Sequence, residues 1–218
     1  MRDNTLAARL VLAASVVAGV SYIWSWGLPL SEPQSLAWKG AGVGLLAVYA
    51  ALKARDLDGW LICAVMAFGA LGDVLLGAAG LVVGAVAFLI GHLIAIGLYW
   101  RNRRAVTTPS QRLLAVALVP ATVVIAFLLP ADRAGAPGVA FYALGLALMA
   151  AFAWTSRFPR YRVGLGALMF VASDLLIFAR EGALAGAAWI GLAIWGLYYF
   201  GQMLICVGVT GALAKGRG

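Results

Sequence analysis

Residues 60–78 read WLICAVMAFGALGDVLLGA, an apolar stretch in which Asp73 is the only charged residue. A transmembrane helix needs about 20 predominantly apolar residues to cross a hydrocarbon core roughly 30 Å thick. This stretch is long enough to cross, and similar runs repeat along the 218 residues. We therefore predict an all-α polytopic membrane protein, with residues 1–218 forming a single transmembrane domain.

The overall composition supports the same class. Hydrophobic residues make up 64% of the chain and charged residues only 11%, whereas about a quarter of a soluble domain is charged. The net charge of +8 is compatible with nucleic-acid binding, but the basic residues lie in short clusters between apolar segments and form no single patch. We therefore expect the lipid bilayer as a partner, and no nucleic acid.

Charged residues, Pro and Gly divide the apolar sequence into eight predicted spans. The first run resembles the core of a signal peptide, but it is long and lacks a convincing cleavage site, so we interpret it as a retained helix. The predicted spans are 6–26, 36–52, 60–78, 81–100, 113–129, 137–154, 162–179 and 187–213.

The distribution of basic residues predicts the orientation, because short loops rich in Lys and Arg stay in the cytoplasm. Eight spans put both termini on one side, and that side carries thirteen of the 16 basic residues. We therefore expect cytoplasmic termini in a multi-pass protein of the cell membrane, which in a bacterium is the inner membrane. The residues on the terminal side are Arg2, Arg9, Lys53, Arg55, Arg101, Arg103, Arg104, Arg112, Arg157, Arg160, Arg162, Lys215 and Arg217, and those opposite are Lys39, Arg133 and Arg180.

Two short segments in separate spans are similar to each other. Residues 71–76 read LGDVLL and residues 172–177 read ASDLLI, so each places an aspartate in a similar apolar context. The sequence is compatible with a duplication into halves 1–104 and 105–218, and also with chance similarity. Four spans per half make such repeats parallel, which predicts similar depths for the two aspartates, toward the outer side.

Asp73 and Asp174 are the acidic residues that fall inside predicted spans. A charged group near the middle of a bilayer costs at least about 2.5 kcal/mol on insertion scales, so such a residue is a functional candidate by default. The alternative is a structural aspartate that is hydrogen-bonded to neighbouring helices. Gly69 and Gly77 flank Asp73 at one-turn spacing, and small residues let another helix approach. We therefore predict that Asp73 faces protein.

The single histidine, His92, lies in the span 81–100, where Phe88, Ala95 and Tyr99 share its helical face. A lone histidine can make a structural hydrogen bond or contribute to a site. One histidine argues against a membrane zinc hydrolase, since catalytic zinc sites usually need three protein ligands rich in His.

One face of the last span carries Trp195, Tyr198, Tyr199 and Gln202 at i, i+3, i+4 and i+7. Most other tryptophans lie near predicted span ends, as interfacial residues do. This stripe lies near the middle of a span, where hydroxyl and amide groups need partners. Packing accounts for the rings, and the polar tips are equally compatible with the lining of a site.

Four short segments together resemble the YhhN family, which includes the animal lysoplasmalogenases. The segments are 72–76 (GDVLL), 88–92 (FLIGH), 170–174 (FVASD) and 198–202 (YYFGQ). Their order and spacing match the family from the third span to the eighth, whereas the first two spans contribute little. The chain has Ala95 and Ile96 where family members often carry an aromatic residue after the histidine, a departure that bears on substrate detail more than on the family.

The resemblance implies a hydrolase that cleaves the vinyl ether bond of a lysoplasmalogen, a single-chain lysophospholipid, into a fatty aldehyde and a glycerophospho head group. It implies Asp73 and Asp174 as the catalytic residues, since two carboxyls held close together do not both ionise and so supply one proton donor and one anion. The scheme needs neither a metal nor an organic cofactor. The implied substrate-binding residues are His92, Ser173, Trp195, Tyr198, Tyr199 and Gln202.

Two other classes of protein use paired intramembrane acids. A proton- or ion-coupled transporter would use them as a proton relay or a cation site. An intramembrane aspartyl protease would also share a proton between two aspartates, but the residues before Asp73 are Ala70-Leu71-Gly72, which lack the first glycine of a Gly-x-Gly-Asp motif. We rank the protease last.

Overall fold

The computed structural model describes residues 2–216, with side chains from Thr5 onward. Arg217, which was counted among the cytoplasmic residues, lies outside that range. The described part contains eight helical spans long and apolar enough to cross a membrane, the seventh of which includes a short π-helical turn, and this confirms the predicted all-α class with eight spans. They are α1 (Arg2–Ser25), α2 (Glu32–Lys53), α3 (Leu57–Ala78), α4 (Leu81–Arg101), α5 (Pro109–Leu128), α6 (Ala136–Thr155), α7 (Leu165–Arg180) and α8 (Ile190–Lys215), with a π-helical turn η1 (Arg160–Gly164) before α7.

The outward faces of these helices suit a bilayer. Val82, Leu113, Val116 and Phe141 are between 68% and 75% exposed, an arrangement that soluble monomers avoid over large areas. A helix satisfies its backbone hydrogen bonds internally, so such faces are compatible with lipid. The protein is therefore a multi-pass membrane protein, and its orientation stays a prediction.

Four helices, α1, α2, α3 and α5, begin three or four residues before the predicted spans, because their first turns are polar. Asp56 Oδ1 accepts a hydrogen bond of 2.8 Å from the backbone N of Gly59 at the start of α3. Thr108 and Gln111 bond to each other's backbone N–H at the start of α5. Such caps stabilise helix starts, but the residues that make them are hydrophilic and are missed by a hydropathy criterion.

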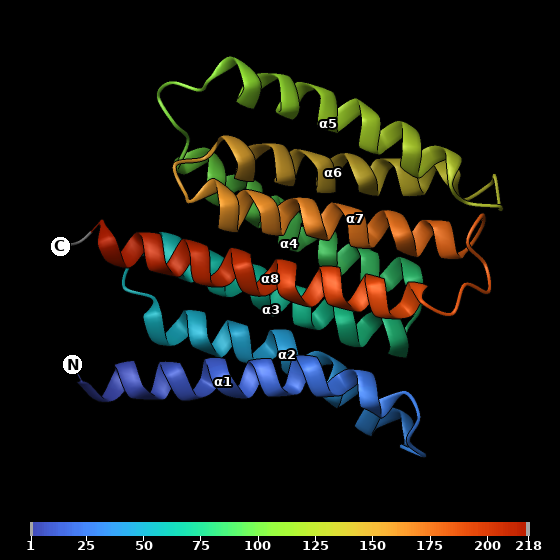
Figure 1. Cartoon of the computed structure of the whole chain (residues 1–218), viewed down its shortest axis with the longest axis horizontal. Helices are drawn as coiled ribbons and strands as arrows, with labels where there is room; N and C mark the ends of the chain where they lie inside the picture. The colour runs from blue at the N-terminus through green and yellow to red at the C-terminus, as the bar shows by residue number, and fades with distance from the viewer. Residues whose placement is uncertain (1, 217–218) are drawn as a thin grey trace. The chain divides into compact units, whose positions relative to one another are not determined.

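The chain divides into two compact units, Met1–Ala95 with Thr210–Gly218, and Ile96–Val209. α4 and α8 contribute residues to both units. In the first unit, α2 packs against both α1 and α3. In the second unit, α6 packs against both α5 and α7 (Figure 1). The duplication into halves 1–104 and 105–218 stays a prediction.

Glycines let the helices of the first unit approach closely. A Cβ atom on Gly72 would lie 2.8 Å from the ring of Phe88, and one on Gly84 would lie 2.8 Å from the backbone of Leu76. Gly80 connects these two antiparallel helices with φ of +89°, a conformation that favours glycine. α3 and α4 therefore form a tight helical hairpin that holds residues 72 and 88 in contact.

In the second unit, α7 and α8 cross at a pair of glycines. A Cβ atom on Gly166 would lie 2.6 Å from the backbone oxygen of Gly201, and one on Gly201 would lie 2.7 Å from the oxygen of Gly166. Small residues at helix crossings bring backbones close enough for extensive packing in a membrane. This crossing fixes the face of α8 that carries the aromatic stripe.

Candidate functional site

The second unit holds Asp174 in a defined environment. Its side chain on α7 is 5% exposed, and the hydroxyl of Tyr142 on α6 donates a hydrogen bond of 2.6 Å to its Oδ2 atom. The Tyr142 ring meets Phe178 edge to face, with ring centroids 6.1 Å apart, which holds the hydroxyl in place. In the described part of the chain, Tyr142 is the hydrogen-bond partner of this carboxyl, so Oδ1 keeps its capacity for another contact.

Ser173 ties α7 to α8 beside this aspartate. Its hydroxyl donates to the backbone oxygen of Ile194 at 3.0 Å, and Ile194 directly precedes Trp195, the first residue of the aromatic stripe. Asp174 therefore lies at the depth where the stripe begins. The Ser173 hydroxyl donates its proton in this hydrogen bond to the backbone, and its oxygen can still accept a second hydrogen bond.

The aromatic stripe of α8 is buried and closely packed. The rings of Trp195 and Tyr199 stack, with an interplanar angle of 15° and centroids 6.1 Å apart. Tyr198 meets Phe170 of α7 edge to face at 5.2 Å. The stripe therefore forms a rigid aromatic wall against α7, which favours apolar chains and flat groups over charged ones.

Gln202 ends the stripe with an unsatisfied polar atom. Its side chain is 1% exposed, and its Oε1 atom has no hydrogen-bond partner among the described residues. A buried acceptor without a donor costs free energy, so such an atom in a native fold calls for a specific explanation. The atom is therefore a candidate acceptor for a hydroxyl group or a water molecule.

The first unit holds Asp73 and His92. Asp73 is 2% exposed, which confirms that it faces protein. It directly follows Gly72, on which the Phe88 ring packs, and His92 lies one turn after Phe88 on α4. Phe88, His92, Ala95 and Tyr99, which share one face of α4, are all buried.

The predicted site residues are divided between the two units. Asp73 and His92 belong to the first, and Ser173, Asp174 and the four stripe residues belong to the second. Tyr142 was not predicted. The signal for it is a tyrosine inside the span 137–154, since a phenol in that position needs a partner for its hydroxyl.

A comparison with protein families supports the motifs found in the sequence. The model of the YhhN family matches residues 34–209, a region that begins in α2 and takes in both aspartates, the histidine and the α8 stripe. The family match therefore includes nearly all of α2, whereas none of the four motifs lies in that helix. No curated protein and no solved structure matches the chain. Because the family match covers well over half of the sequence, the chain belongs to the YhhN family.

Proposed function

We propose that this protein is a membrane lysoplasmalogenase, which hydrolyses the vinyl ether bond of a single-chain ether phospholipid to a fatty aldehyde and a glycerophospho head group. The YhhN family includes lysoplasmalogenases. In this chain, the observation that carries the proposal is the buried carboxyl of Asp174, held through one oxygen by Tyr142.

The chemistry needs a proton donor and a proton acceptor. In the first step, a neutral carboxyl gives its proton to the β-carbon of the vinyl ether, and the double-bond electrons form the new C–H bond. The product is an oxocarbenium ion, which an anionic carboxylate stabilises in a water-poor site. Glycosidases divide labour between two carboxyls in a comparable way.

Water completes the reaction. Its oxygen bonds to the cationic carbon while the anionic carboxylate takes a proton, which gives a hemiacetal. Collapse of the hemiacetal forms the aldehyde carbonyl, breaks the bond to the glycerol oxygen and transfers a proton to that oxygen. One water molecule is consumed, and both carboxyls return to their starting states after proton exchange.

The proposal assigns the two carboxyl roles to Asp73 and Asp174 as a pair. Trp195, Tyr198 and Tyr199 would line the path of the alkenyl chain, because aromatic walls bind apolar chains. Gln202 Oε1 would accept a hydrogen bond from the glycerol hydroxyl of the lyso lipid, and His92 and Ser173 would contact the glycerol or the attacking water.

The test is incubation of the purified protein with three lysolipids of equal chain length, which carry a vinyl ether, a saturated ether or an ester. Mass spectrometry measures the products. We expect fatty aldehyde from the vinyl ether alone, since the saturated ether has no double bond to protonate. In deuterated water the aldehyde should carry deuterium at carbon 2, the former β-carbon.

Release of fatty acid from the ester lipid would contradict the proposal. So would the absence of aldehyde from the vinyl ether lipid with folded protein. Proton- or ion-dependent uptake into vesicles by such an inactive preparation would favour a transporter.

A further inference from the structure

Six arginines lie on or beside two neighbouring connections at one end of the second unit, and we call this region the arginine end. Within residues 96–209 the acidic residues are Asp132, Asp174 and Glu181, which belong to other loops or to the α7 span. None of the six arginines forms an ion pair with a described residue. They are Arg103 and Arg104 after α4, Arg112 in the first turn of α5, and Arg157, Arg160 and Arg162 between α6 and α7.

Hydrogen bonds join the two connections into one platform. The backbone N of Arg157 donates to the oxygen of Asn102 at 2.8 Å, and Nε of Arg104 donates to the oxygen of Ser156 at 2.7 Å. Asn102 is itself buried and bonds to the oxygen of Leu98 through its side chain. The arginines are therefore carried by a fixed backbone and not by two independent loops.

Arg160 has a donor that lacks an acceptor. Its Nε atom is inaccessible to solvent and has no hydrogen-bond partner in the described part of the chain. The guanidinium carbon lies 5.7 Å from the ring of Trp154 and 5.6 Å from the ring of Tyr161, so the group is partly desolvated. A desolvated cationic N–H without an acceptor is costly. The π-helical turn that begins at this residue is a feature often found at functional sites.

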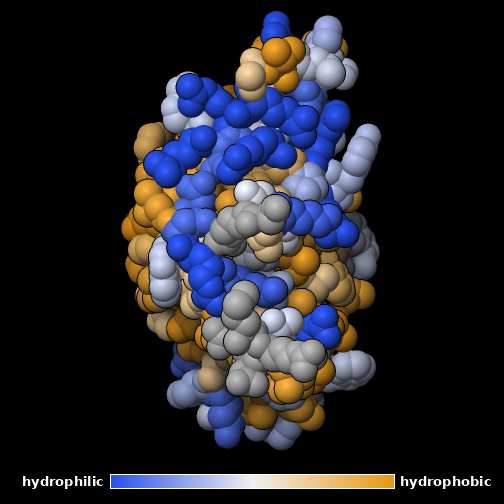
Figure 2. All heavy atoms as spheres, turned by 90° about the vertical axis from the view of Figure 1, so that its left-hand side faces the viewer, coloured by the Kyte–Doolittle hydropathy of each residue, from blue (hydrophilic) through white to orange (hydrophobic). Residues whose placement is uncertain are grey.

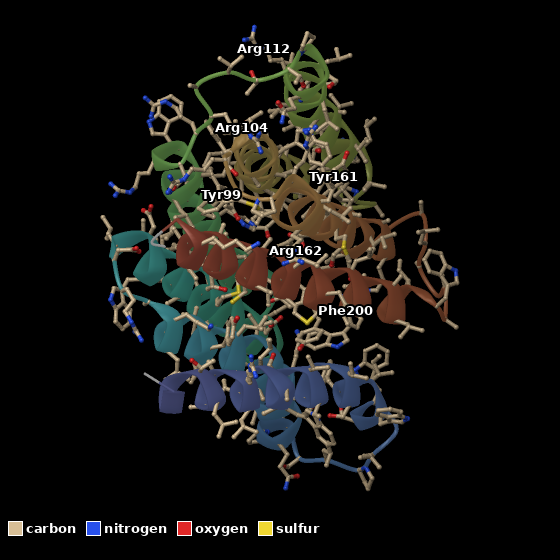
Figure 3. The ribbon with its side chains drawn as sticks, turned by 60° about the vertical axis from the view of Figure 1, so that its left-hand side comes forward. Tyr99, Arg104, Arg112, Tyr161, Arg162 and Phe200 are labelled. Atoms are coloured by element: carbon tan, nitrogen blue, oxygen red, sulfur yellow. The ribbon has the colours of Figure 1, made fainter. Side chains whose placement is uncertain are left out.

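Aromatic residues place this end of the unit at the membrane surface. Tyr161 is 77% exposed, and Trp100, over whose ring the Arg103 guanidinium lies at 5.1 Å, is exposed as well. Exposed Trp and Tyr side chains at helix ends lie at the level of the lipid head groups. Figure 2 faces the helix ends and shows hydrophilic side chains gathered there, and Figure 3 labels Arg104, Arg112, Tyr161 and Arg162.

We propose that the arginine end binds the phosphate of an anionic phospholipid from the surrounding leaflet. Orientation in the membrane requires only positive charge, which Lys supplies as well as Arg, yet residues 96–209 contain no lysine. The guanidinium group pairs with phosphate through two parallel hydrogen bonds, which an ammonium group cannot do. The lipid phosphate supplies the missing counter-charge to the guanidinium groups. This site is independent of the proposed hydrolysis.

The test is native mass spectrometry of the full-length protein with phosphatidylglycerol and phosphatidylcholine of identical chains. Arg104→Gln with Arg160→Gln should weaken phosphatidylglycerol binding about 25-fold, at about five-fold per arginine, and leave phosphatidylcholine binding unchanged. The matched control is Arg133→Gln with Arg180→Gln, which removes the same charge from the loops at the other helix ends and should leave both lipids bound as in the wild type.

The first double variant could misfold, because it removes the hydrogen bond of Arg104. A second pair, Arg157→Gln with Arg162→Gln, controls for this, because both side chains are exposed and donate no hydrogen bond to the described residues. It should also weaken phosphatidylglycerol binding. Unchanged binding in this pair, or an equal loss in the control pair, would overturn the proposal. Displacement of the lipid by an equal concentration of inorganic phosphate would show that the site takes free phosphate and not a lipid head group.

Discussion

At the scale of single residues, the hydrogen bond from Tyr142 to Asp174 makes the most specific prediction. Tyr142→Phe keeps the ring against Phe178 but removes the donor that orients the carboxyl. Hydrogen bonds to charged groups contribute about 1.5–3 kcal/mol, so we expect kcat to fall about 10- to 100-fold while KM changes little. Steady-state kinetics on the lyso vinyl ether lipid measures both. A change in KM alone would mean that Tyr142 has a role in binding and does not orient the carboxyl.

Gln202 makes a separate prediction about specificity. Its buried Oε1 atom has no donor among the described residues, and a lyso lipid offers the free glycerol hydroxyl that a two-chain lipid lacks. A site that must satisfy such an atom discriminates against an analogue without the hydroxyl. Gln202→Leu should therefore reduce the preference for the lyso over the two-chain vinyl ether lipid about 5- to 100-fold. The ratio of the two kcat/KM values measures this preference, and an unchanged ratio would contradict the assignment.

The sequence was informative about the ionisable groups of the site and less so about their partners. Asp73 and Asp174 stand out because a charged residue inside an apolar span costs free energy and is therefore a functional candidate. Tyr142 does not stand out, since tyrosine is common in spans and its hydrogen bond depends on how α6 packs against α7. The orphaned oxygen of Gln202 could not be predicted either, because it requires knowledge of every neighbouring donor.

At the scale of helices, the crossing of α7 and α8 predicts which glycine cannot be replaced. Gly201→Ala would put a Cβ atom 2.7 Å from the Gly166 oxygen and should destabilise the protein by about 1–3 kcal/mol. Gly196→Ala on the same helix is the control, because its Cβ atom would meet nothing within 4 Å and alanine favours helix. Thermal unfolding in detergent compares the two variants. Equal stability would mean that the helices separate at no cost.

Hydropathy located the helices but did not predict where they begin. The apolar runs located all eight helices, but four of them start earlier than predicted. These are α1, α2, α3 and α5, whose first turns begin with Arg2, Glu32, Leu57 and Pro109. Their caps depend on single side-chain to backbone hydrogen bonds, such as that of Asp56. The π-helical turn before α7 was not predicted, because its extra backbone residue leaves no distinct pattern in the sequence.

At the scale of the whole molecule, the charge distribution predicts the topology. Reporters fused at the amino terminus, after Asp56, after Arg103 and at the carboxyl terminus should all report cytoplasm. Cysteines that replace Glu32, Gly80, Ala136 or Glu181 should react with an impermeant label from the external side. Protection of all four would mean that the orientation is inverted, and a carboxyl terminus outside would contradict eight crossings.

The number of spans followed from the sequence because each must cross the same thickness of hydrocarbon. Family membership followed because four motifs occurred in order, and the family match over residues 34–209 confirmed it. The sequence evidence for the duplication is weaker than that for the number of spans or for the family. Its evidence is a resemblance between two short apolar segments, and apolar spans draw on few residue types.

The central claim is that two intramembrane carboxyls perform the hydrolysis, and aldehyde release by aspartate variants tests it most directly. The measurement is aldehyde formed per mole of monodisperse purified protein for wild type, Asp73→Asn, Asp174→Asn and the double variant. Asparagine keeps nearly the same shape but cannot deliver a carboxylic proton or carry negative charge. Groups that act as one unit are non-additive, so we predict that either substitution alone abolishes release as fully as both together, with the folded protein still in the membrane. Near wild-type release by Asp73→Asn or by Asp174→Asn would contradict the two-carboxyl mechanism.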